Sequence, residues 1–230
     1  MLIGGIQKLS LLDYPEKICC TIFTAGCNYR CPFCHNASIL QPDLRSPAIP
    51  EEEVLEFLKK RKGLIDGVCI TGGEPLLQPQ IADFIANIRG LGFLVKLDTN
   101  GSFPDKLNEL IEANLLDYVA MDVKNSPEKY GLTVGTENYD IRPVEESISL
   151  LLSGKLPYEF RTTVVRELHT CGDFQKIARW IQGAEHYYLQ SFVDSEDVLV
   201  SGFHSCSSEE LQEFLKVVQT LVPSVRLRGV

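Results

Sequence analysis

The sequence predicts an α/β protein built on a parallel sheet. Short apolar runs rich in β-branched residues alternate with segments of helical periodicity, and this strand–helix unit occurs six times. Parallel strands joined by right-handed helical crossovers produce such an alternation. The chain has 230 residues, of which 44% are hydrophobic, so it can bury a core without disulfide support. Six units are too few for the closed eight-stranded barrel, which leaves an open doubly wound sheet or a partial barrel.

The predicted strands are short, apolar and bounded by turn residues or helical segments. The first, KICCTIFTA, and the fifth, YEFRTTVV, show the β-branched composition most clearly. In chain order, the strands are expected at residues 17–25, 67–70, 93–97, 118–123, 158–165 and 186–191.

The predicted helices carry start signals and apolar faces. The first has Pro50 near its start, acidic residues in its first turn and Gly63 after its end. The sixth begins with the capping-box pair Ser207 and Glu210. In chain order, the helices are expected at residues 50–62, 79–89, 104–113, 144–152, 173–181 and 207–218.

Charge and composition narrow the class of function. The net charge is −9 and the pI is about 5.0, whereas nucleic-acid-binding proteins usually carry a basic stripe, so we expect no nucleic-acid partner. No secretory signal is visible and no apolar run approaches the roughly 20 residues of a membrane helix, so we expect a cytoplasmic protein without a membrane partner. In that compartment its eight cysteines are expected to bind metal, catalyse or pack in the core.

Three cysteines follow the first predicted strand closely. Cys27, Cys31 and Cys34 stand within eight residues, so their thiols can converge on one metal centre. Zinc is one interpretation, with His35 or a distant cysteine as the fourth ligand. The other is an iron–sulfur cluster with one iron left open, because no fourth cysteine stands nearby.

The cysteine spacing, with an aromatic residue before the last cysteine, resembles the signature of the radical S-adenosylmethionine (SAM) superfamily. Within it, the chain is most similar to the activating enzymes of glycyl radical proteins. The segments that carry this resemblance are Cys31–Asn36, Ile3–Pro15, Leu97–Ser102, Tyr118–Lys124 and Tyr158–Val165. The likeness weakens after about Phe192.

The resemblance implies a fold and two cofactors. The fold is a partial (β/α)6 barrel of the TIM type, open on one side, with residues 1–230 as one domain. Its core covers about 17–192, and a C-terminal helix and strand follow at 207–228. Cys27, Cys31 and Cys34 would hold a [4Fe–4S] cluster that cleaves SAM. Only about sixteen residues separate Cys34 from Pro50, which leaves no room for an insert with further clusters.

A paired-glycine turn, Thr71-Gly72-Gly73-Glu74-Pro75, follows the second predicted strand. Two glycines let the backbone approach a ligand closely. The same turn is also compatible with a tight strand–helix connection. By the resemblance, this segment binds the amino group of the methionine moiety, with Glu74 as an acceptor.

Polar residues stand at the ends of later strands, where parallel α/β folds gather their ligand sites. Asp98 and Thr99 follow the third strand in an ordinary turn sequence, while Asp122 and Lys124 end the fourth. By the resemblance, Lys124 contacts the carboxylate of SAM. Asp98, Thr99 and Asp122 would hold a monovalent cation.

Three further residues complete the expected site. Arg161 lies inside the fifth strand, where an arginine is costly unless paired, and a charge on an edge strand is one interpretation. By the resemblance, it lies inside the barrel, near the cofactor or the substrate glycine. Gln190 ends the sixth strand and would reach the adenosine. Phe33, between the last two cysteines, would pack near the adenine.

By the resemblance, the chain is expected to be a radical SAM activase. It would form a glycyl radical on a partner enzyme, with anaerobic ribonucleoside-triphosphate reductase favoured over pyruvate formate-lyase. A flavodoxin or a ferredoxin-type protein would donate the electron. The alternatives are a radical SAM enzyme that acts on a small molecule and a non-catalytic zinc or iron–sulfur module.

Overall fold

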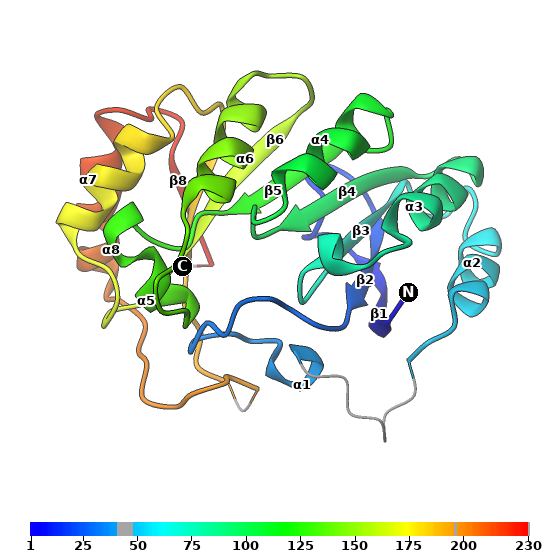
Figure 1. The fold of residues 1–230 in the computed structure, drawn as a ribbon, viewed down its shortest axis with the longest axis horizontal. Helices are drawn as coiled ribbons and strands as arrows, with labels where there is room; N and C mark the ends of the chain where they lie inside the picture. Colours follow the sequence, from blue (N-terminus) through cyan, green and yellow to red (C-terminus); the bar gives the residue numbers. More distant parts are fainter. Residues whose placement is uncertain (41–47, 196, 230) are drawn as a thin grey trace.

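Eight strands form one sheet in sequence order in the computed structural model, which describes residues 1–40, 48–195 and 197–229 (Figure 1). Strands β2 to β8 are parallel, and β1 is antiparallel to β2. The strands are β1 Ile3–Ser10, β2 Cys19–Thr24, β3 Gly67–Gly72, β4 Leu94–Thr99, β5 Tyr118–Asp122, β6 Tyr158–Val164, β7 Tyr187–Ser191 and β8 Arg226–Arg228.

The predicted fold class is confirmed. Strands β2 to β7 match the six predicted strands within two residues at each end. The sheet is not closed, because no pairing in the described residues joins β1 to β8. The sequence did not reveal β1. Gly4 and Gly5 weaken its strand pattern, and register shifts break its pairing with β2.

Helices cover the outer face of this curved sheet, as Figure 1 shows for α3, α4, α6 and α7. Helix α3 buries Ile81, Phe84, Ile85 and Ile88 on its inner stripe. The α-helices are α1 Ala37–Leu40, α2 Glu51–Lys59, α3 Ile81–Gly90, α4 Pro104–Glu112, α5 Tyr130–Val134, α6 Arg142–Leu152, α7 Cys171–Trp180 and α8 Ser208–Gln219, and the 3-10 helices are η1 Pro75–Leu77 and η2 Pro127–Lys129. Within the described ranges, none of these helices has the length and apolarity that crossing a membrane requires.

The two faces of the sheet differ in chemistry. On β4, Val95 and Leu97 belong to the hydrophobic core, while Lys96 and Asp98 alternate with them and lie on the other face. On β6, Phe160 belongs to the core and Arg161 lies opposite. The inner face of the curved sheet therefore collects charged side chains, while its outer face packs against the helices.

Candidate functional site

A cavity of about 230 Å³ opens at the C-terminal ends of the parallel strands. It brings together every residue that the sequence predicted for the site except Glu74 and Pro75. The lining also includes residues that the sequence did not single out. These are Tyr29, Asn36, Leu40, Asn100 and Thr163, and the lining further includes His35, named above as a possible zinc ligand, and Thr71 of the paired-glycine turn.

The three motif cysteines lie in the loop after β2, and all three thiols are free. Cys31 is buried, while Cys27 and Cys34 are partly exposed. Burial raises the pKa of the Cys31 thiol to about 12 and also raises that of Cys27. Both thiols are therefore neutral in the metal-free protein, and a metal centre that binds them must release their protons.

The zinc interpretation lacks its nearest fourth ligand. His35 lines the cavity, but its Nε2 makes a hydrogen bond with the Val193 carbonyl and its ring packs on Phe192. Among the residues that the structure describes, no three His, Cys, Asp or Glu side chains form a ready site for one metal ion. Three thiols facing an open cavity suit an iron–sulfur cluster, which cysteine thiolates hold.

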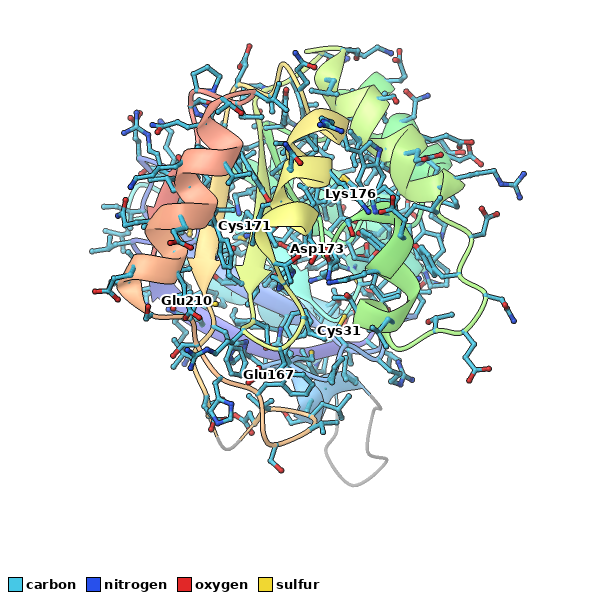
Figure 2. The ribbon with its side chains drawn as sticks, turned by 90° about the vertical axis from the view of Figure 1, so that its left-hand side faces the viewer. Cys31, Glu167, Cys171, Asp173, Lys176 and Glu210 are labelled. Carbon is cyan, nitrogen blue, oxygen red and sulfur yellow. The ribbon has the colours of Figure 1, made fainter. Side chains whose placement is uncertain are left out.

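The cysteine loop is braced by α5 and the segment before it. The Arg30 amide donates to the Val134 carbonyl at 2.9 Å, and Figure 2 shows Cys31 close to this helix. Asp173 of α7 anchors the segment in turn, because it accepts hydrogen bonds from Ser126 at 3.1 Å and Lys129 at 2.6 Å. Helix α7 therefore helps to hold the cysteine loop in place, although the two are far apart in the sequence.

The paired glycines let two loops touch backbone to backbone. The Gly73 amide donates to the Thr24 carbonyl at 2.9 Å, and an added Cβ at Gly73 would lie 1.9 Å from the Gly26 oxygen. Gly72 has φ +117°, a conformation that side chains rarely adopt. The β3 turn and the cysteine loop are therefore fixed against each other at the cavity wall.

Glu74 lies beneath the cavity rather than in it. Its fully buried carboxylate accepts hydrogen bonds from Thr99 Oγ1 at 2.8 Å, the Asn100 amide at 2.7 Å and the Leu76 amide at 3.1 Å. Burial raises its pKa to about 7. These donors turn the carboxylate inward, and its expected role as an acceptor for the amino group of SAM stays a prediction. It ties the β3 turn to the β4 turn, and Pro75 is buried beside it at the start of η1.

Arg161 lies between two carboxylates from neighbouring strands. Its Nε donates to Asp122 Oδ1 at 2.9 Å, and its Nη1 donates to Asp98 Oδ2 at 3.0 Å. Lys124 Nζ binds the other Asp122 oxygen at 2.9 Å, and Lys96 Nζ binds the other Asp98 oxygen. Burial opposes the ionised carboxylates, but these cations outweigh it and lower the pKa of Asp98 and of Asp122.

These contacts occupy the carboxylate oxygens that the expected monovalent cation would use. Each oxygen of Asp98 and Asp122 already has a positively charged side-chain partner. The Thr99 hydroxyl donates to Glu74. The sequence did not draw attention to Lys96. Its signal was a lysine two residues before Asp98, on the same face of an apolar strand.

Comparisons with known proteins agree with this geometry. The profile of the radical SAM superfamily matches residues 21–181. A protein of Methanocaldococcus jannaschii, provisionally named a glycyl-radical enzyme activating enzyme, is 33% identical over all of this chain and 96% of its own length. The pyruvate formate-lyase-activating enzyme of Clostridium pasteurianum is 32% identical over 54% of this chain and 52% of its own.

Solved structures share the fold. A domain of the pyruvate-formate lyase-activating enzyme from Bacteroides vulgatus superposes with a TM-score of 0.58 at 17% identity, covering 71% of this chain and 99% of that domain. Streptococcus suis SuiB bound to precursor peptide SuiA gives a TM-score of 0.73 at 11% identity, over 91% of this chain and 48% of SuiB. The chain therefore belongs to the radical SAM superfamily, whose enzymes use a [4Fe–4S] cluster and S-adenosylmethionine.

Proposed function

We propose that this radical SAM enzyme generates a glycyl radical on a partner protein, with anaerobic ribonucleoside-triphosphate reductase as the favoured partner. The observation that carries the proposal is one cavity that joins three free thiols to the charged ends of β4, β5 and β6. Full-length similarity to a protein named as a glycyl-radical enzyme activating enzyme supports the activase class. Pyruvate formate-lyase or another glycyl radical enzyme is the alternative partner.

Cys27, Cys31 and Cys34 would hold the cluster in this proposal. When bound, the cluster and SAM supply reductive cleavage of the sulfonium to methionine and a 5′-deoxyadenosyl radical, which takes a Cα hydrogen from the partner's glycine. A flavodoxin or a ferredoxin-type protein would supply the electron. The free state of all eight cysteines fits the reducing conditions of a cytoplasmic protein.

The strand-end residues would orient SAM. Gly72 and Gly73 would let it lie against backbone, and Lys124 would face its carboxylate as a compact positive charge. Asp98, Asp122 and Arg161 would hold Lys124 and the floor of the cavity in one arrangement, with Thr99 fixing the wall through Glu74. Gln190 and Phe33 would contact the adenosine. The protein thus binds, orients and excludes water, while the cofactors carry the difficult chemistry.

A small-molecule substrate is the main rival. The 7-carboxy-7-deazaguanine synthase of Methanopyrus kandleri is 34% identical over 44% of this chain and 46% of its own length. That similarity covers less of the chain than the match to the glycyl-radical activating protein. Activity with a purine precursor and none with a glycyl radical enzyme would favour the rival.

Anaerobic reconstitution tests the proposal in two stages. We expect about four irons per chain and dithionite-dependent release of 5′-deoxyadenosine. Cys31→Ser should lose both, whereas Cys171→Ser, which changes an exposed cysteine outside the cavity, should keep both. Zinc binding without 5′-deoxyadenosine would contradict the enzyme function.

The second stage adds the reductase from the same organism. A glycyl radical doublet in the electron paramagnetic resonance spectrum is expected after incubation with SAM and reductant. A silent spectrum with competent cofactors would reject that partner, and the same assay with pyruvate formate-lyase would test the alternative.

A further inference from the structure

We propose that Lys96 is a built-in cation of the SAM site, which lets the enzyme bind SAM without a monovalent metal ion. The proposal rests on the proposed function in one respect, namely that the cavity binds SAM. It assigns a positioning role to a buried lysine that does not itself line the cavity.

Lys96 lies directly below the cavity floor. It stands two residues before Asp98 on β4, so the two side chains share the inner face of the sheet. Lys96 is 1% exposed, and its ammonium contacts Asp98 Oδ1 and lies 3.9 Å from Cys69 Sγ. A lysine is almost never this buried unless it is paired. The ion pair with Asp98 therefore makes the burial of the Lys96 ammonium possible.

The charges around Lys96 form one linked set. Lys96, Arg161 and Lys124 supply three positive charges, and Asp98 and Asp122 supply two negative ones, which leaves one net positive charge. Lys96 and Lys124 bind the outer oxygens of the two carboxylates, and Arg161 bridges the inner ones. One surplus positive charge suits a ligand that carries a carboxylate.

A monovalent metal ion would compete with this arrangement. An added cation would double the surplus charge in a buried site, where repulsion between like charges is poorly screened. It would also have to displace an ammonium or guanidinium group to reach an oxygen of Asp98 or Asp122. Lys96 thus supplies, from the protein itself, the positive charge that Asp98 requires.

Binding of SAM to the reconstituted wild-type enzyme tests this without any substitution. Titration calorimetry in sodium, potassium and tetramethylammonium salts of equal ionic strength should give the same dissociation constant. Binding that requires sodium or potassium would overturn the role of Lys96. Failure to bind SAM in every salt would instead contradict the proposed function of the cavity.

The variant Lys96→Met tests whether the Lys96 charge takes the place of a monovalent metal ion beside Asp98. It removes the charge and keeps an unbranched side chain, so Asp98 Oδ1 loses its partner. We expect about tenfold weaker SAM binding in tetramethylammonium, partly restored by sodium or potassium that enters beside Asp98. Lys60→Met, which changes an exposed lysine of the α2 terminus, should bind SAM like the wild type in all three salts.

A purely structural role for Lys96 would weaken binding equally in all salts, and that result would overturn the proposal. Unchanged affinity in every salt would overturn it as well. Thermal unfolding of each variant establishes that it is folded. If Lys96→Met does not fold, the wild-type titration still decides, because it needs no variant.

Discussion

Arg161 of β6 and Asp122 of β5 are register partners on neighbouring strands, and Arg161 Nε donates to Asp122 Oδ1 at 2.9 Å. The same guanidinium reaches Asp98 on β4, so one side chain links three strands at their C-terminal ends. A shift of one residue in any of these strands would turn its charged group to the outer, apolar face. The ion network of Arg161, Asp122 and Asp98 therefore forms only in this register of β4, β5 and β6.

Removing the guanidinium should be costly. Arg161→Met leaves inner oxygens of Asp98 and Asp122 without their shared partner, and breaking a buried pair in this way costs about 3–5 kcal/mol. The matched control is Arg142→Met, because the Arg142–Asp140 pair is exposed to solvent and should contribute little to stability. Urea denaturation measures both variants. An equal loss of unfolding free energy in the two variants would show that the buried ion pairs stabilise the fold no more than the exposed pair does.

Glu74 should give stability an unusual dependence on pH. Burial raises its pKa from 4.5 to about 7 in the folded state, so the folded protein holds this proton more tightly than the unfolded chain does. The stability that protonated Glu74 contributes is therefore fully present below pH 4.5. As the pH rises toward 7, up to about 3 kcal/mol of the free energy of unfolding is lost. The pKa values of Asp98 and Asp122 are lowered, so the stability that they contribute is lost only when the pH drops below about 4. That range does not overlap with the range in which Glu74 titrates.

Glu74→Gln isolates this effect, because the amide does not titrate. The stability of the wild type relative to this variant should fall between pH 4.5 and pH 7, as measured by chemical denaturation at each pH. The variant is itself expected to be less stable at every pH, since its amide group meets the donors of Thr99, Asn100 or Leu76. A constant difference across this range would rule out a raised Glu74 pKa.

The contact between Gly73 and Gly26 should tolerate no side chain. Gly73→Ala places a Cβ 1.9 Å from a backbone oxygen, so the β3 turn and the cysteine loop must separate. Overpacking of this kind costs about 1–3 kcal/mol and should also abolish SAM binding, since both segments line the cavity. Gly90→Ala is the control. Its Cβ meets nothing within 4 Å at the end of α3, and a stability equal to or above that of the wild type is expected. SAM binding by a folded Gly73→Ala variant would show that the cavity does not need the close contact between Gly73 and Gly26.

The strands and the cysteine loop could be predicted because their signals are local. Short apolar runs between helical segments mark β2 to β7, and parallel strands place the residues after them on one edge. That is why Cys27, Asp98 and Asp122, which are far apart in the sequence, were expected together and line one cavity.

The features that escaped prediction depend on tertiary contacts. In sequence, Lys96 shares a strand face with Asp98, but only the pairing of the two in the folded sheet explains its burial. The inward turn of Glu74 depends on donors that the β4 turn supplies. Strand β1 holds two glycines and gains its order from pairing with β2, which no local pattern reveals.

Arg228 should stabilise the fold from the last strand. Its guanidinium donates to both Glu159 oxygens, at 2.9 and 3.0 Å, and stacks 3.7 Å over the Tyr188 ring. Glu159 is 1% exposed, so Arg228→Met should leave its charge buried, with the Tyr118 hydroxyl as its one remaining side-chain donor in the described part of the chain. We expect a loss of about 2 kcal/mol, below the full cost of a broken buried pair because Arg228 itself is about one-third exposed.

A double substitution separates the charge from the packing of this last strand. Glu159→Gln combined with Arg228→Met removes the unpaired charge, so the double variant should recover part of the stability that Arg228→Met loses. Arg226→Met, in the same short strand but at an exposed position, should have little effect on denaturation. A double variant no more stable than Arg228→Met would mean that the unpaired Glu159 charge carries no penalty, which would contradict the importance of the Arg228–Glu159 pair.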